Sequence, residues 1–196
     1  MKSGTVFRHL WALCISILLI VPSSSYARDY IIDTKGMHAS IQFKIKHLGF
    51  SWLTGRFEKF DGVFSYDKKQ PENSHIQITV QTASINSNHA ERDKHLREKK
   101  YLNVKKYPEA SFVSSAFTPL GEGLFTLDGT LNLHGVSRPV SMLVKHVGKG
   151  RDPWGKFRRG FEASVDIRLT NFGIHGFIGR DVHTLELIIN LEGIRQ

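Results

Sequence analysis

The sequence predicts an all-β fold, an eight-stranded antiparallel β-barrel with a short helical insertion around residues 89–106. Three observations predict it. Short stretches alternate between apolar and polar residues with a period of two, as half-buried strands do. Turn-forming residues separate most of these stretches, and one charged segment interrupts them with the composition of a helix. Eight such strands must hide their apolar faces, and an up-and-down barrel does so without leaving open sheet edges.

The chain begins with an expected secretory signal peptide, residues 1–27. Basic residues come first, an apolar run covers residues 10–21, and small residues precede the expected cleavage after Ala27. A helix over that run would span about 18 Å, short of the ~30 Å hydrocarbon core, so a cleaved signal is favoured over a retained anchor. The mature domain is then residues 28–196, and we expect it to be periplasmic.

The mature domain is large enough to bury a core and contains no cysteine, because the single cysteine, Cys14, lies in the apolar run. Its core must therefore stabilise it without disulfides. The chain has 27 Lys and Arg against 18 Asp and Glu. This balance indicates either contact with an anionic membrane surface or general solubility alone. The basic residues are scattered, so we expect no nucleic-acid partner.

Eight stretches are expected to be strands. The clearest alternation covers residues 41–45, 76–80, 125–133, 140–144, 161–169 and 185–191. Residues 56–66 and 111–117 show a weaker pattern. In the first of these two, the parity of the apolar residues shifts around Asp61–Gly62, which predicts a β-bulge or a sharp bend there.

Residues 88–107 are charged and helical in composition. Asn88 can cap a helix, and Glu91 three residues later would complete a capping box. Asp93 and Arg97 have the i,i+4 spacing of an ion pair. We expect one or two helical turns here, inserted between the third and fourth strands.

The sequence offers little for catalysis. The mature chain holds no cysteine nucleophile, no Gly-x-Ser-x-Gly elbow and no glycine-rich phosphate loop. His89 and His95 are six residues apart, which places them on different faces of a helix and disfavours a shared metal ion. We expect no catalytic residues, no metal site and no enzyme activity. Two alternatives stay open: an enzyme acting on an apolar substrate through His89 with Glu91 or Asp93, and a stress-induced structural protein.

Several short motifs follow one another along the mature chain. They cover residues 29–33, 45–51, 55–57, 60–62, 107–108, 131–136, 152–155 and 160–163, and the most specific is NHAERDKHLR at 88–97. With these motifs the chain resembles the YceI-like family of periplasmic polyisoprenoid-binding proteins over essentially the whole mature chain. The loop around residues 174–182 departs from the family pattern, which leaves any contact it makes open.

The resemblance implies a lipocalin-like barrel that carries or scavenges a long isoprenoid, such as a ubiquinone or a polyprenyl lipid. A dry tunnel suits such a ligand, because burial is worth about 0.8 kcal/mol per methylene. By parity we expect its wall to include Phe43, Ile45, Phe57, Phe112, Leu131, Phe161 and Val165, and its rim His47, His89 and Arg92. The expected partners are the lipid and a membrane surface, with no cofactor besides the ligand, and a homodimer is the default assembly.

Overall fold

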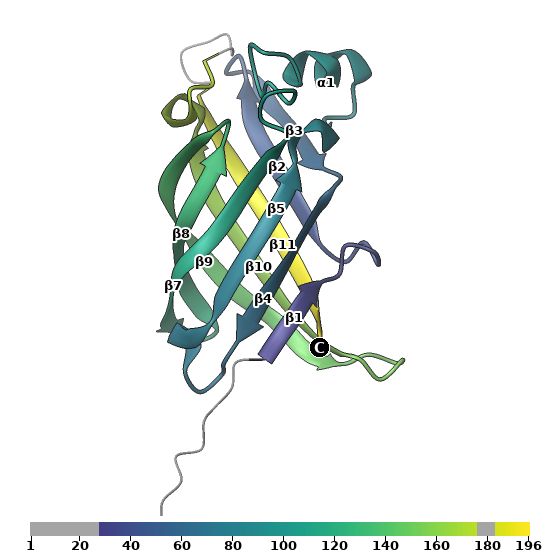
Figure 1. The fold of residues 1–196 in the computed structure, drawn as a ribbon, viewed down its shortest axis with the longest axis vertical. Helices are drawn as coiled ribbons and strands as arrows, with labels where there is room; N and C mark the ends of the chain where they lie inside the picture. Colours follow the sequence, from purple (N-terminus) through teal and green to yellow (C-terminus); the bar gives the residue numbers. More distant parts are fainter. Residues whose placement is uncertain (1–27, 176–182) are drawn as a thin grey trace, which may run out of the picture.

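The computed structural model describes residues 28–175 and 183–196, and most of these residues lie in strands. The strands are β1 (Arg28–Ile32), β2 (Ser40–His47), β3 (Ser51–Phe57), β4 (Phe60–Tyr66), β5 (His75–Gln81), β6 (Ile85–Asn86), β7 (Glu109–Gly121), β8 (Leu124–Leu133), β9 (Val136–Arg151), β10 (Phe157–Arg168) and β11 (Thr184–Arg195). They form one antiparallel sheet in the order β1-β4-β5-β7-β8-β9-β10-β11-β2-β3-β6. A pairing of β1 with β11 closes the sheet into a barrel (Figure 1).

The barrel has eight strand positions, because three of them are each shared by two consecutive segments of the eleven. One edge of β11 pairs with β2 over residues 185–190 and then with β1 over residues 193–195. β1 pairs in turn with β4, and β2 with β3. The segments β1 and β2 are therefore one interrupted strand, as are β3 and β4. The short β6 pairs with β3 and continues the position of β5, which pairs with β4. The predicted eight-stranded antiparallel barrel is confirmed.

The interruption between β3 and β4 lies at residues 58–59, and the bulge predicted at Asp61–Gly62 is wrong. β4 pairs with β5 from Phe60 to Ser65 without a register shift. Gly62 lies on the inner face with Phe60, and a Cβ there would lie 2.9 Å from the side chain of Ile32 and 2.5 Å from a backbone oxygen. This glycine therefore marks a crowded point inside the barrel, where no larger residue fits.

The predicted helical insertion is present, and its helix has the expected length of about two turns. It contains the helix α1 (Ala90–Leu96), followed by turns up to Tyr107. The cap is His89, whose Nδ1 accepts a hydrogen bond from the backbone of Arg92, and not Asn88, which has a φ of 60°. Three short 3-10 helices complete the chain: η1 (Pro71–Asn73), η2 (Thr82–Ser84) and η3 (Leu169–Phe172).

The side chains of Asp93 and Arg97 bond to the chain just before the helix rather than to each other. Asp93 is buried and accepts hydrogen bonds from the backbone and hydroxyl of Ser87. Arg97 donates to the carbonyls of Ala83 and Ile85. The predicted pair between Asp93 and Arg97 is therefore replaced by bonds that attach α1 to β6 and η2.

The barrel has two different ends, which we call upper and lower (Figure 1). The upper end carries α1, the β2–β3 turn and the β8–β9 turn, and the lower end carries the β7–β8 and β9–β10 turns. Among the described residues no helix is long and apolar enough to cross a membrane. The predicted signal peptide, residues 1–27, lies outside the described residues, as do residues 176–182 of the loop whose pattern departed from the family.

Candidate ligand-binding site

The inward faces of the strands enclose two cavities that follow one another along the barrel axis. On β2, Ile41 lines the lower cavity, whereas Phe43 and Ile45 line the upper one. On β11 the lining passes in the same way from Leu187 in the lower cavity to Leu185 in the upper. The two cavities are therefore successive parts of one barrel interior.

The lower cavity has a volume of about 120 Å³ and an almost wholly apolar wall. Alternation places these side chains inside, because every second residue of a strand points to the same face. The wall includes Ile78, Phe112, Leu127, Leu131, Met142, Val144, Phe161, Ala163, Val165 and Ile189. Such a surface can hold hydrocarbon but offers few polar groups to recognise or transform a ligand.

The upper cavity is larger, about 310 Å³, and its wall comes from more varied elements. Strand residues such as Leu53 and Leu185 form one side. The helical insertion supplies Leu96, Tyr101 and Leu102, which lie across the end of the barrel. The sequence of the insertion is mostly charged, and its few apolar side chains are the ones that cover this cavity.

Two aromatic rings lie where the cavities meet. The ring centroids of Phe43 and Phe57 are 6.1 Å apart and tilted by 55°. The ring of Phe43 packs over Gly55, where a Cβ would come within 2.3 Å of it. Both rings lie next to Ile41 of the lower cavity, because Ile41 precedes Phe43 by two residues on β2 and is paired with Phe57.

The lower end is closed by a buried arginine among aromatic rings. Arg159 is only 7% exposed, and its guanidinium carbon lies 4.1 Å from the centroid of the Tyr66 ring. It donates hydrogen bonds to the hydroxyl of Tyr30 (3.3 Å) and to Nε2 of His146 (3.2 Å). Burial and the nearby cation lower the pKa of His146, which keeps its imidazole neutral and able to accept this bond.

Aromatic packing extends this closure toward the lower cavity. The rings of Tyr30 and Phe64 stack with centroids 4.7 Å apart, and those of Phe117 and Phe125 stack at 4.4 Å. Phe161 makes an edge contact with Phe64. The lower end is thus filled by side chains, and a ligand cannot enter there without displacing them.

The upper end is where the interior reaches solvent. Lys46, His47 and Leu48 are exposed and also line the upper cavity. Across the mouth, Arg92 lines the cavity while donating to the hydroxyl and carbonyl of Ser87. A ligand head group at this mouth would meet two cations and an imidazole.

The structure brings nine of the ten predicted site residues to the cavities. Phe112, Leu131, Phe161 and Val165 line the lower one, and Phe43, Ile45, His47, Phe57 and Arg92 line the upper one. His89 lines neither, because its ring caps α1. Its proposed catalytic partners are also elsewhere: Asp93 is buried against Ser87, and Glu91 is exposed.

Sequence reasoning missed several residues of the interior. Tyr66 continues the inward alternation of β4, a signal that the misplaced bulge concealed. Leu96 and Leu102 were detectable as isolated apolar residues in a charged segment. Arg159 had no such signal, because an arginine at an inward position is normally read as a register error.

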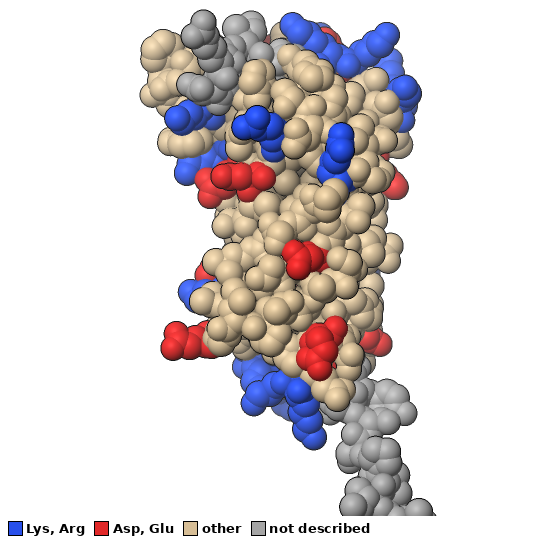
Figure 2. Space-filling model, turned by 90° about the vertical axis from the view of Figure 1, so that its left-hand side faces the viewer, with Lys and Arg blue, Asp and Glu red and all other residues tan. Residues whose placement is uncertain are grey.

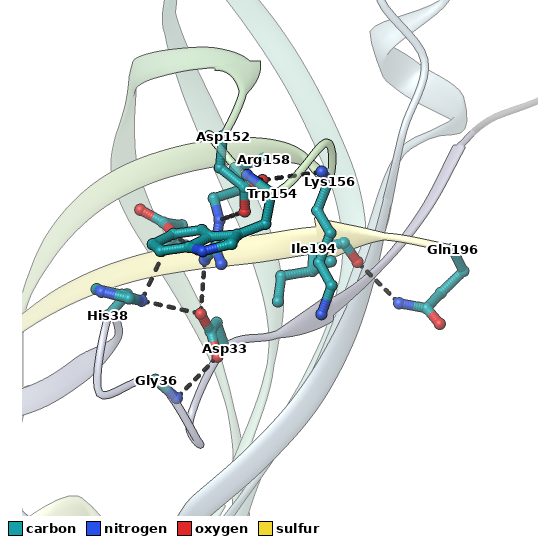
Figure 3. Close-up of polar contacts among 10 residues, drawn as sticks. Asp33, Gly36, His38, Asp152, Trp154, Lys156, Arg158, Ile194 and Gln196 are labelled. Atoms are coloured by element: carbon teal, nitrogen blue, oxygen red, sulfur yellow. Dashed lines mark hydrogen bonds and ion pairs between the residues drawn. The ribbon is translucent and has the colours of Figure 1, made fainter.

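Among the described residues, one cluster has the ligand types and spacing of a metal site, but the guanidinium of Arg158 already binds two of its carboxylates. Ligand atoms of Asp33, His38 and Glu192 lie within 4.8 Å of one another at the lower end. Arg158 donates to Asp33 at 2.6 Å and to Asp152 at 2.7 Å (Figure 3). It also donates to Glu192 at 2.6 Å. The bond from His38 and the guanidinium of Arg158 hold the pKa of Asp33 at about 2, below its ordinary 3.8.

Comparison with known proteins identifies the family of this chain. A profile of the YceI-like domain matches residues 30–192. The chain belongs to the YceI-like family. A UPF0312 protein of Azotobacter vinelandii is 45% identical to this YceI-like chain over 189 residues, which are 96% of this chain and 98% of the relative.

Solved structures share the YceI-like barrel. Burkholderia cenocepacia BcnA matches with a TM-score of 0.73 at 20% identity, over 82% of this chain and 98% of that one. A polyisoprenoid binding domain from Saccharophagus degradans matches with a TM-score of 0.63 at 14% identity, over 87% and 100%. At these identities the likeness shows a common fold.

Proposed function

We propose that this chain is an exported binding protein that holds a long, slender isoprenoid-type lipid in its barrel, and that it is not an enzyme. One observation carries the proposal: two apolar cavities follow each other along the barrel, and the interior reaches solvent at its upper end. The family membership and the polyisoprenoid-binding name of a protein with the same fold support this ligand class. The quinone or polyprenyl type and a periplasmic location, with residues 1–27 as export signal, belong to the same proposal.

The walls favour a chain over a compact ligand. Each methylene removed from water contributes about 0.8 kcal/mol, so a chain that fills both cavities would gain affinity without specific polar contacts. It would pass Phe43 and Phe57 by rotating the rings, and its head group would stay near Lys46, His47 and Arg92 at the mouth. The histidine and the carboxylate that line the lower cavity have partners of their own: His75 is hydrogen-bonded to Ser65 at 2.6 Å, and Glu162 forms an ion pair with Lys145 at 3.2 Å.

Native mass spectrometry of the protein purified from its own host, with organic extraction, tests the proposal. We expect one lipid of isoprenoid mass at near-stoichiometric occupancy. Ala163→Phe adds a ring to the wall of the lower cavity, and Ser164→Phe adds the same ring to the outer face of the same strand as a control. Ala163→Phe should lose the lipid, and Ser164→Phe should keep it.

A second pair protects the test against misfolding. Leu53→Trp fills the upper cavity, and its neighbour Thr54 is exposed, so Thr54→Trp is the matched control. Thermal unfolding identifies variants that retain the fold. Folded inward variants with undiminished lipid, or a wild-type protein that carries none, would overturn the proposal.

A further inference from the structure

The hairpin at the upper mouth exposes three large apolar side chains close together. Phe50 is 86% exposed, Trp52 53% and Leu48 47%. They lie on the β2–β3 turn, which is closed by a hydrogen bond from the backbone of Phe50 to the carbonyl of His47. Exposed apolar residues that are contiguous in this way mark interaction surfaces rather than ordinary solvent contact.

The turn holds one of these side chains at a conformational cost. Leu48 has a φ of 53° and Gly49 a φ of 84°, as in the two-residue turns that favour Asn-Gly. A leucine in the left-handed region is strained by about 1–2 kcal/mol. The fold thus retains an apolar residue at the tip where a polar one would be more stable.

Cations surround this apolar lip, which we define as Leu48, Phe50 and Trp52. Lys44 and Lys46 lie 4.3 Å and 5.8 Å from the centroid of the Trp52 ring. Across the mouth, residues 87–108 contain seven Lys and Arg against three Asp and Glu. Of these lysines, Lys94 has an ion pair, at 3.9 Å; the exposed Lys99, Lys100, Lys105 and Lys106 have none with a described carboxylate.

The lower end offers a useful contrast, because Lys and Arg side chains gather near both ends of the barrel (Figure 2). There Arg158 is bound by three carboxylates. The exposed apolar side chains Met37, Leu120, Val147 and Trp154 are spread over the β1–β2 loop, β7, β9 and the β9–β10 turn. Charge alone therefore does not distinguish the ends, but the upper end gathers three large exposed apolar side chains, two of them aromatic, on a single hairpin.

We infer that the upper end docks on an anionic membrane surface, with the apolar lip inserted among the head groups and the lysines of residues 94–106 against lipid phosphates. Aromatic rings prefer this interfacial depth, and each basic residue near an anionic surface adds to the attraction. Docking in this orientation places the mouth of the upper cavity against the bilayer. The docking itself does not depend on what the cavity holds. The idea that docking serves to load lipid into the cavity rests on the proposed function.

Tryptophan fluorescence tests the orientation, because Trp52 and Trp154 lie at opposite ends and Trp11 is the only other tryptophan. Variants with Trp11→Phe and either Trp52→Phe or Trp154→Phe keep one reporter each. Vesicles of phosphatidylcholine with phosphatidylglycerol should shift the emission of Trp52 to shorter wavelength and leave that of Trp154 unchanged. A shift of Trp154 alone, or of neither, would overturn the inference.

Vesicle sedimentation measures the two contributions separately. Phe50→Ser should weaken binding by about tenfold, which corresponds to the loss of one buried aromatic side chain, whereas Trp154→Ser should leave it unchanged. Lys99→Glu should weaken it by about fivefold or more, and Lys156→Glu at the lower end should not. Equal binding to pure phosphatidylcholine, or equal loss in the lower-end variants, would overturn the inference. Vesicle binding is measured without reference to copurified lipid. Membrane docking can therefore be disproved while the proposed lipid binding stands, and the reverse.

Discussion

The lower and upper halves of the barrel are built from the same alternating strands but are completed differently. The lower half is filled by stacked aromatic rings around the buried Arg159, and Arg158 bridges three carboxylates outside it. The upper half holds the larger cavity and is covered by an insertion whose regular helix is only seven residues long. One end of a closed sheet can thus be packed for stability while the other end leaves the interior accessible from solvent.

The buried arginine should show the largest difference between the halves. Arg159→Ala should lower the free energy of unfolding by about 3 kcal/mol, because Tyr30 and His146 lose their donor and a void forms beside Tyr66. Arg92→Ala at the upper mouth removes two hydrogen bonds in a half-exposed place and should cost about 1 kcal/mol. Urea unfolding measures both, and equal losses would contradict the division.

Substitutions at two inward-facing glycines, Gly193 in the lower half and Gly55 in the upper half, test how tightly each half is packed. A Cβ at Gly193 would meet the ring of Phe64 at 2.3 Å, and that ring is stacked on Tyr30. Gly193→Ala should therefore cost about 2–3 kcal/mol. Gly55→Ala should cost about 1 kcal/mol, because Phe43 can rotate into the upper cavity and the nearby carbonyl belongs to the short edge strand β6. Thermal unfolding of the two variants checks the order, and a larger loss for Gly55→Ala would reverse it.

The carboxylate cluster predicts a dependence of stability on pH at the lower end. The pKa of Asp33 is about 2 in the folded protein against an ordinary 3.8, so its stabilisation is complete above about pH 4 and is lost as the pH falls toward 2. We expect the difference between wild type and Asp33→Asn to shrink by roughly 1 kcal/mol over this window, after solvent screening. Urea unfolding at several pH values measures it, and a constant difference would contradict the assignment.

The upper end should show the smallest electrostatic effect. Glu91 and Lys94 form an ion pair at 3.9 Å with both side chains 70% exposed. Such pairs contribute about 0.3–0.5 kcal/mol at most, so Glu91→Gln should leave the unfolding midpoint nearly unchanged. A loss as large as that of Asp33→Asn would mean that the insertion contributes as much to stability as the lower cluster.

Much of the fold could be predicted because alternation is a local property. The apolar residues within 161–169 and within 185–191 share one parity, which identifies the inward face of each strand. The same reasoning predicted the wall residues Phe112, Leu131 and Val165. The misplaced bulge shows the limit of this reasoning. Both Gly62 and residues 58–59 interrupt the alternation of apolar and polar residues. The regular pairing of β4 with β5 was needed to show that the break in the strand lies at residues 58–59 and not at Gly62.

The sequence by itself determined the eight strands, the helical insertion and the apolar faces, because these depend on residues close together in the chain. Only the tertiary structure decided which end is closed and which is open. That difference depends on the hydrogen bond from Arg159 to Tyr30 and on Leu102 packing against the buried cluster that contains Ile45, contacts between residues far apart in sequence. The structure also showed that His89 caps a helix instead of lining the mouth, because its Nδ1 accepts a hydrogen bond from the backbone of Arg92.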